Sequence, residues 1–258
     1  MQPTPYPDVN ALVDLILAGI QQIVGPKLVG LSIFGSLAAG DFDPGTSDVD
    51  LLAALTADLD DAEFDGLLRM QTDVVLNQPQ WDNRIEIIYV AVAKLRRLAP
   101  HHTIARISPG EPFHITEAGP HRMLDLSVLR HQGITLAGPP PATLIDPISR
   151  ADLVRALDDV MRDWRQWITE TDLSHQRSDQ AYMILTMCRA LYTFRHGESA
   201  SKRRAATWAM QTFPEWSTLI RDALIWRQAA DNDHGDGDAT LPRTLQFVHF
   251  AMDTFAPV

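Results

Sequence analysis

One stretch decides the fold of this chain: Phe34-Gly35-Ser36-Leu37-Ala38-Ala39-Gly40, continued downstream by Thr46-Ser47-Asp48-Val49-Asp50-Leu51-Leu52. Apolar strands are expected over residues 28–34 and 49–55, and the second begins beside two aspartates. Side chains alternate along a strand, so Asp48 and Asp50 project from the same face. Because Mg²⁺ prefers oxygen ligands, two carboxylates at this spacing predict a shared magnesium site.

Gly35 and Ser36 mark the point where the first of these strands ends. A glycine lets the backbone approach a phosphate closely, and the Ser36 hydroxyl with neighbouring N–H groups can donate to phosphate oxygens. A metal ion that bridges phosphates neutralises their charge and fixes the geometry of in-line attack. Asp-x-Asp pairs are common by chance on exposed turns, but unpaired charges are costly inside an apolar strand. The combination therefore indicates phosphoryl-transfer chemistry.

A third acid, Glu86, lies within an apolar, β-branched run that predicts a strand over residues 84–92. If this strand neighbours the one that carries Asp48 and Asp50, Glu86 points at the same metal site. It then acts as the general base for an attacking hydroxyl, or as a third metal ligand. The alternative is an edge-strand carboxylate that is paired with Arg84 or Arg106.

A proline-rich segment, Gly138-Pro139-Pro140-Pro141, separates two kinds of sequence pattern. The elements expected before it are a helix from residue 8 to a stop at 25–26, strands over 28–34, 49–55 and 84–92, and helices over 58–76 and 122–130. No element is assigned between residues 93 and 115. After it only helical stripes recur, over 149–168, 179–196, 201–214, 216–226 and 241–255. We predict an α/β domain over residues 1–148 and an all-α helical bundle over residues 149–258.

Composition narrows the classes of partner. The net charge is -11 with no stripe of Lys and Arg, so binding to a nucleic-acid backbone is not expected. Such a field attracts cations, which are metal ions or a polyamine-like substrate. No apolar run approaches the roughly 20 residues of a membrane helix, and the N-terminus does not read as a signal peptide. One cysteine, Cys188, fits a reducing cytoplasm. We therefore expect a cytoplasmic protein, a monomer, with no membrane partner.

Other enzyme classes lack their motifs here. The sequence has no Gly-x-x-x-x-Gly-Lys-Ser/Thr loop, which argues against a P-loop ATPase. It also has no Gly-x-Ser-x-Gly elbow and no Cys/His spacing of the zinc-binding kind.

The residues Gly35-Ser36, Asp48-Val49-Asp50 and Glu86 together resemble the signature of the nucleotidyltransferase superfamily. More narrowly, the chain resembles the aminoglycoside (3'')(9) adenylyltransferases. The narrower resemblance rests on stretches of the second half of the chain: Leu185-Thr186-Met187-Cys188-Arg189, Gly197-Glu198-Ser199-Ala200-Ser201-Lys202 and Ala206-Thr207-Trp208-Ala209. It implies an α/β (α+β) nucleotidyltransferase domain with a mixed sheet, followed by an all-α bundle, with ATP as co-substrate.

The resemblance also implies roles for single residues. Gly35 and Ser36 would contact the ATP phosphates, with Ser47 as a further contact, while Asp48 and Asp50 would bind Mg²⁺. Glu86 would be the catalytic base. From the helical domain, Arg189 and Lys202 would reach the ATP phosphates, although both also read as ordinary solvated helix charges. Asp179 falls where the family has a carboxylate that meets a cationic drug.

The positions that face the acceptor depart from the family pattern. Streptomycin-modifying members carry a tryptophan after a Gly-Glu pair, where this chain has Gly110-Glu111-Pro112-Phe113, and a second drug-binding aspartate is replaced by His175. Phe113 and His175 are therefore expected at the substrate site, with spectinomycin or another aminocyclitol favoured over streptomycin. Two alternatives remain: the same chemistry on a metabolite or a protein, as in toxin–antitoxin systems, and a non-catalytic nucleotide-binding module.

Overall fold

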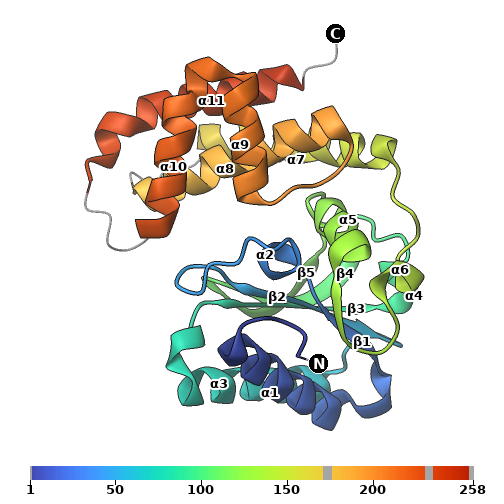
Figure 1. The fold of residues 1–258 in the computed structure, drawn as a ribbon. Helices are drawn as coiled ribbons and strands as arrows, with labels where there is room; N and C mark the ends of the chain where they lie inside the picture. Colours follow the sequence, from blue (N-terminus) through green and yellow to red (C-terminus); the bar gives the residue numbers. More distant parts are fainter. Residues whose placement is uncertain (1, 171–175, 230–234, 256–258) are drawn as a thin grey trace. The chain divides into compact units, whose positions relative to one another are not determined.

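The computed structural model describes residues 2–170, 176–229 and 235–255, and the chain divides into two compact units (Figure 1). The first unit comprises residues 1–42 and 47–147, and the second comprises residues 43–46 and 148–258. The first is built on a mixed sheet with helices and the second is helical, so the predicted fold class is confirmed. The boundary expected between residues 148 and 149 stays a prediction.

The sheet of the first unit has six strands in the order β5-β4-β3-β2-β1-β6. β2 and β3 pair in parallel at its centre, and the other neighbours are antiparallel. The parallel pair is joined through α3, as a crossover connection requires. The strands are β1 Leu28–Ile33, β2 Val49–Leu55, β3 Ile85–Ala91, β4 Thr103–Ser108, β5 Glu111–Glu117 and β6 Ile134–Ala137.

Helices cover both faces of this sheet (Figure 1). α1 (Pro7–Val24) and α3 (Asp61–Asn77) bury their apolar stripes against one face, where Leu51 and Ile87 complete the core. α5 (Arg122–Gln132) packs on the opposite face against Leu52 and Ile88. The shorter helices of this unit are η1 Gly25–Lys27, α2 Gly35–Ala38, η2 Pro79–Trp81, α4 Val92–Leu95 and α6 Pro141–Leu144.

The segment for which the sequence predicted no element forms the antiparallel hairpin of β4 and β5. Its turn contains Gly110, whose φ of 77° lies in the region that favours glycine. Both strands are only partly buried: the first residue of β4 is exposed, and so are the first two residues of β5. Their weak hydrophobic contrast explains why neither was recognised.

No apolar run of the length that a membrane helix needs was recognised in the sequence, but α1 meets that criterion. The window Pro7–Lys27 has a mean hydropathy of 1.4, so among the described residues one helix is long and apolar enough to cross a membrane by composition alone. In the structure α1 packs in the core instead, with Leu12, Ile16 and Ile20 fully buried. The length and hydropathy of α1 therefore reflect its burial against the sheet.

The helical unit is organised around α8, which packs against α7, α9, α10 and α11. Gln180 of α8 is completely buried, and its amide bonds the Gly237 carbonyl at 2.8 Å and the hydroxyls of Thr240 and Thr244. Buried amides need such partners, so Gln180 fixes α11 against α8. The helices are α7 Arg150–Glu170, α8 Arg177–His196, α9 Lys202–Thr212, η3 Pro214–Trp216, α10 Ser217–Ala229 and α11 Gly237–Thr254.

Candidate active site

The two central strands carry the predicted acids side by side. Asp50 of β2 and Glu86 of β3 are direct partners in the parallel register, and Asp48 immediately precedes β2. The condition set by the sequence, that the two strands be neighbours, is therefore met. Neighbouring strands lie about 4.8 Å apart, so the backbone holds these carboxylates close together.

Gly35 lies directly against Asp50. Its φ is 65°, and a Cβ built on it would stand 1.8 Å from Oδ2 of Asp50. The Phe34 N–H also donates to the Asp50 carbonyl at 3.0 Å. The turn after β1 is thus moulded around the Asp50 carboxylate, and no residue with a side chain fits at position 35 without displacing it.

Ser36 and Ser47 flank the same acids with different exposure. Ser36 is half-buried in α2, where its carbonyl accepts from the Asp41 N–H at 2.9 Å. Ser47 is buried, and its carbonyl accepts from Nη2 of Arg84 at 2.6 Å. Arg84 in turn lies over the Trp81 ring. Arg84 therefore braces the segment that leads into Asp48.

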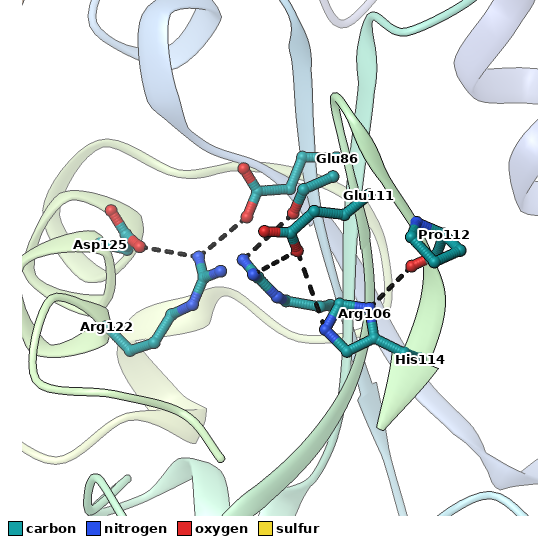
Figure 2. A network of polar contacts seen from close by, with 8 residues as sticks. Glu86, Arg106, Glu111, Pro112, His114, Arg122 and Asp125 are labelled. Carbon is teal, nitrogen blue, oxygen red and sulfur yellow. Dashed lines mark hydrogen bonds and ion pairs between the residues drawn. The ribbon is translucent and has the colours of Figure 1, made fainter. Parts of the chain in front are cut away.

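Glu86 is held by a buried arginine of α5 (Figure 2). Nη1 of Arg122 donates to Oε1 of Glu86 at 2.9 Å and to Oδ2 of Asp125 at 2.9 Å. Arg122 is 4% exposed, so its guanidinium and the Glu86 carboxylate meet in a largely dry environment. Two carboxylates here share one positive charge.

Burial dominates the titration of Glu86. Removal of its carboxylate from water raises the pKa of Glu86 above its ordinary value of 4.5, and the repulsion from Asp125 acts in the same direction. The charge and hydrogen bond of Arg122 oppose this rise but do not cancel it. A carboxylate with a raised pKa suits a general base, because it accepts a proton more readily.

The alternative interpretation of Glu86 is wrong in both of its parts. β3 is an inner strand between β2 and β4, and the partner of Glu86 is Arg122 rather than Arg84 or Arg106. Arg106 bonds Glu111 instead, and His114 lies 3.8 Å from the same carboxylate (Figure 2).

Arg122 and Asp125 were missed as site residues. On the sequence they open a short helix in which both read as ordinary polar positions. Their partner Glu86 lies 36 residues away from Arg122, and no local pattern links them. The available signal was the i, i+3 spacing of Arg122 and Asp125, which puts an opposite-charge pair on one helix face.

The predicted residues of the helical unit lie on α8 and at the start of α9. Nε of Arg189 donates to the Ala200 carbonyl at 3.1 Å, which braces the turn before α9. Ser201 caps α9 by accepting from the Arg204 N–H, and Nζ of Lys202 lies 5.2 Å from the centre of the Tyr182 ring. Both cations are half-buried, so neither is a simple solvated charge.

Asp179 and His175 are the residues of the second half of the chain that the sequence predicts at the acceptor site. Asp179 is exposed in the first turn of α8, on the surface where a cationic ligand has access. His175 lies outside the described residues.

Phe113 lies in the core of the first unit and not at a substrate site. Its side chain is 8% exposed, stacks on Phe64 of α3 at 4.3 Å and meets Tyr89 edge-on at 5.6 Å. Side chains alternate along strands, and Tyr89 faces away from Glu86. Phe113 therefore belongs to the core on the α1–α3 face of the sheet, and the assignment of Phe113 to the substrate site is wrong.

This correction predicts that Phe113→Ala lowers the free energy of unfolding by about 3 to 5 kcal/mol, as loss of a buried Phe does. The Michaelis constant for the acceptor stays unchanged. Urea denaturation and initial-rate kinetics measure the two quantities. Ile115→Ala is the matched control, because Ile115 lies on the same strand and is 60% exposed. A raised acceptor KM in Phe113→Ala with normal stability would restore the original assignment.

Two carboxylates at the start of β2 fit a divalent cation by their chemistry. Asp48 and Asp50 are two residues apart on one face and offer the hard oxygen ligands that Mg²⁺ prefers. Gly35 is a second feature that fits this interpretation, because the absence of a side chain there lets the Asp50 carboxylate lie against the turn after β1. Over residues 2–170, 176–229 and 235–255, no group of three or more His, Cys, Asp or Glu side chains is placed to hold a metal. Glu86 as a third ligand is therefore not supported, and its carboxylate bonds Arg122.

Comparison with known families gives a match in the second half of the chain. Residues 143–253 match the family described as aminoglycoside adenylyltransferase, C-terminal domain. A relative named aminoglycoside (3'') (9) adenylyltransferase, from Escherichia coli, is 25% identical over 277 residues, which covers 100% of this chain and 99% of the relative. A relative of the same name from Shigella flexneri is 24% identical and covers the same shares.

A solved structure is also similar. The chain matches the crystal structure of spectinomycin adenyltransferase AAD(9) from Enterococcus faecialis with ATP and spectinomycin, with a TM-score of 0.74 and 15% identity. The match covers 95% of this chain and 98% of that one. At this identity the likeness is one of fold. Together with the relatives it confirms the resemblance that the motifs predicted.

Proposed function

We propose that this chain, a nucleotidyltransferase, adenylylates an aminoglycoside or aminocyclitol with ATP as co-substrate. The proposal starts from its resemblance to the aminoglycoside (3'')(9) adenylyltransferases, which extends over its whole length. The observation that carries the proposal is the register of β2 and β3. It puts a partly buried carboxylate with a raised pKa, Glu86, beside the Asp48–Asp50 pair. A non-catalytic module has no need of a carboxylate kept in that state.

In the proposed reaction the acceptor hydroxyl attacks the α-phosphorus of ATP. The new oxygen–phosphorus bond forms as the bond to the β-phosphate oxygen breaks, so pyrophosphate leaves and the hydroxyl proton passes to Glu86. Gly35 and Ser36 bind phosphate oxygens through backbone and hydroxyl groups, and Ser47 is a further phosphate contact. Mg²⁺, when bound to Asp48 and Asp50, neutralises phosphate charge. Arg189 and Lys202 supply further positive charge to the triphosphate.

The acceptor in this proposal is a cation. The chain has a net charge of -11, and an acidic field raises the local concentration of amino-substituted sugars. Asp179 is exposed and offers a carboxylate to such an amine. We favour spectinomycin over streptomycin, because Pro112 stands where streptomycin-modifying members have a tryptophan. We also propose a cytoplasmic monomer, in keeping with ATP as co-substrate and with Cys188 as a buried free thiol.

The test is transfer of label from [α-³²P]ATP, with pyrophosphate release followed in parallel, in the presence of Mg²⁺. Spectinomycin, streptomycin, kanamycin and no acceptor form the panel. Labelled spectinomycin alone is the expected product. Transfer to streptomycin alone would overturn the choice of drug, and ATP binding without transfer to any drug would favour a metabolite or protein acceptor.

The raised pKa of Glu86 predicts the acid limb of the pH profile. Glu86 accepts a proton only when it is ionised, so kcat/KM falls as the pH drops through its pKa. Because burial raises that pKa, half of the activity is lost at a pH above the ordinary 4.5. Initial rates between about pH 4 and 9 measure the limb. Circular dichroism at each pH is the control for acid unfolding, and full activity in a folded protein at pH 4.5 would contradict the assignment.

A further inference from the structure

α5 contributes a buried cation that the proposed chemistry does not yet use. Arg122 is 4% exposed, and one of its nitrogens, Nη1, contacts both Glu86 and Asp125 (Figure 2). Its Nε is buried and has no hydrogen-bond partner among the residues that the structure describes. A guanidinium cannot lose its proton in a protein, so this charge stays in the interior.

The fold alone does not call for an arginine at this position. The face of α5 that covers β2 and β3 is already apolar through Leu126 and Leu129, which meet Leu52 and Ile88. A buried ion pair is weak evidence for stability, because apolar residues of similar volume often serve as well. An arginine whose Nε is left unsatisfied is a costly way to cover a sheet. The contact with Glu86 is therefore the feature that explains it.

The geometry leaves one oxygen of Glu86 available. Arg122 takes Oε1, and Oε2 accepts no hydrogen bond from the described residues. Arg106, the other arginine whose charge acts on Glu86, is occupied by Glu111 and Ser108. Arg122 is thus the cation that bonds Glu86 within the described residues and fixes how the carboxylate is turned.

Asp125 keeps Arg122 in place. It lies three residues along α5 and takes a bond of the same length from the same nitrogen, 2.9 Å. Because the charge of Arg122 is shared between two carboxylates, Glu86 is oriented without being fully neutralised. A base that must accept a proton needs this balance, since a dedicated cation would lower its basicity.

We propose that Arg122 is a positioning residue for the reaction, and that it turns Glu86 so that Oε2 faces the acceptor hydroxyl while Asp125 tethers the guanidinium to α5. This inference rests on the proposed function. In this role Arg122 acts through Glu86 and not by contact with a substrate.

The test is Arg122→Gln in the full-length protein, with the drug that the wild-type protein labels as acceptor. The kcat is expected to fall by about 100-fold, because misplacement of a catalytic group by an ångström has an effect of that order. The KM values for ATP and acceptor stay within about twofold, since a positioning role involves no contact between Arg122 and either ligand. Arg122→Lys keeps the charge and restores part of kcat. Arg130→Gln is the matched control, because Arg130 lies on the same helix and, among the described residues, bonds the carbonyls of residues 142 and 145 and no carboxylate.

A double variant distinguishes positioning from a general loss of structure. In the Glu86→Gln background, Arg122→Gln is expected to cause no further loss of the residual kcat, because the two residues act as one unit. The paired glutamines also remove the two most buried charges of the network together and leave Asp125, which is 29% exposed, so the double variant is a second route to a folded protein if Arg122→Gln alone does not fold. Multiplicative losses in the double variant would overturn the inference.

The two proposals fail in different ways. If the wild-type protein transfers AMP and folded Arg122→Gln has the wild-type kcat, the positioning role is overturned and the proposed function stands. If the wild-type protein transfers AMP to no acceptor on the panel, the proposed function is overturned and the role of Arg122 with it.

Discussion

Replacement of Glu86 with glutamine is expected to lower kcat for AMP transfer by about 10³-fold, within the range of 10² to 10⁴ that a lost general base commonly costs. Glutamine keeps the shape and one hydrogen-bond acceptor for Arg122, but its amide oxygen does not take up a proton at neutral pH. The affinity for ATP stays near the wild-type value, because Glu86 is not one of the proposed metal ligands, which are Asp48 and Asp50. The Glu86 carboxylate accepts a hydrogen bond from Arg122 instead.

This prediction is measured by single-turnover transfer from labelled ATP and by calorimetric ATP binding. Glu111→Gln is the matched control: Glu111 is a carboxylate of the same network, but it bonds Arg106 rather than Arg122 (Figure 2). Its kcat should remain close to that of the wild-type protein. Near-normal turnover in Glu86→Gln would remove Glu86 as the base and leave the acid limb of the pH profile without its proposed cause.

Gly35→Ala is expected to disable the metal site. An alanine Cβ would stand 1.8 Å from Oδ2 and 2.6 Å from Cγ of Asp50, so the carboxylate must move. The positive φ of 65° adds a backbone penalty of roughly 1 to 2 kcal/mol. Disturbing the groups that orient a metal ligand typically costs 10-fold to 100-fold in affinity. We expect the Mg²⁺ concentration for half-maximal activity to rise by about that factor.

Gly40→Ala separates the two causes. Gly40 also has a positive φ, 68°, but a Cβ there meets nothing within 4 Å. It therefore carries the backbone penalty alone, and its Mg²⁺ dependence should equal that of the wild-type protein. Thermal unfolding and Mg²⁺ titration of both variants provide the comparison. Equal Mg²⁺ dependence in the two variants would mean that Gly35 serves only the turn and not Asp50.

The sequence predicted elements best where the local residue pattern was the one that the position of the element in the fold requires. The strand over residues 49–55 was predicted with the bounds that β2 has, because it is apolar at every position except Asp50, as an inner strand between two helical layers requires. The helix that ends at His196 was predicted through Gly197, which has the left-handed conformation of a C-cap. From the sequence, Glu86 was expected at the metal site only if its strand neighboured the strand of Asp48 and Asp50, and β2 and β3 are indeed paired.

What the sequence did not predict depends on contacts between distant residues. Arg122 and Glu86 carry no signal for each other, since a helix position and a strand position become neighbours only when α5 packs on the sheet. Phe113 was misassigned because its strand went unrecognised. With β5 in place, alternation separates Phe113 from His114 and turns it towards Phe64. The roles of the individual site residues remain proposals that the variants above examine.

The position of Asp50 and Glu86 on the two innermost strands has a consequence for mutational drift. Their separation is set by the spacing between hydrogen-bonded strands, about 4.8 Å, and not by any particular neighbouring side chain. Apolar residues around them can be exchanged for others of similar size while the strands keep their places. Many apolar positions can therefore change, as the 25% identity between this chain and a relative allows, while the two carboxylates keep their separation.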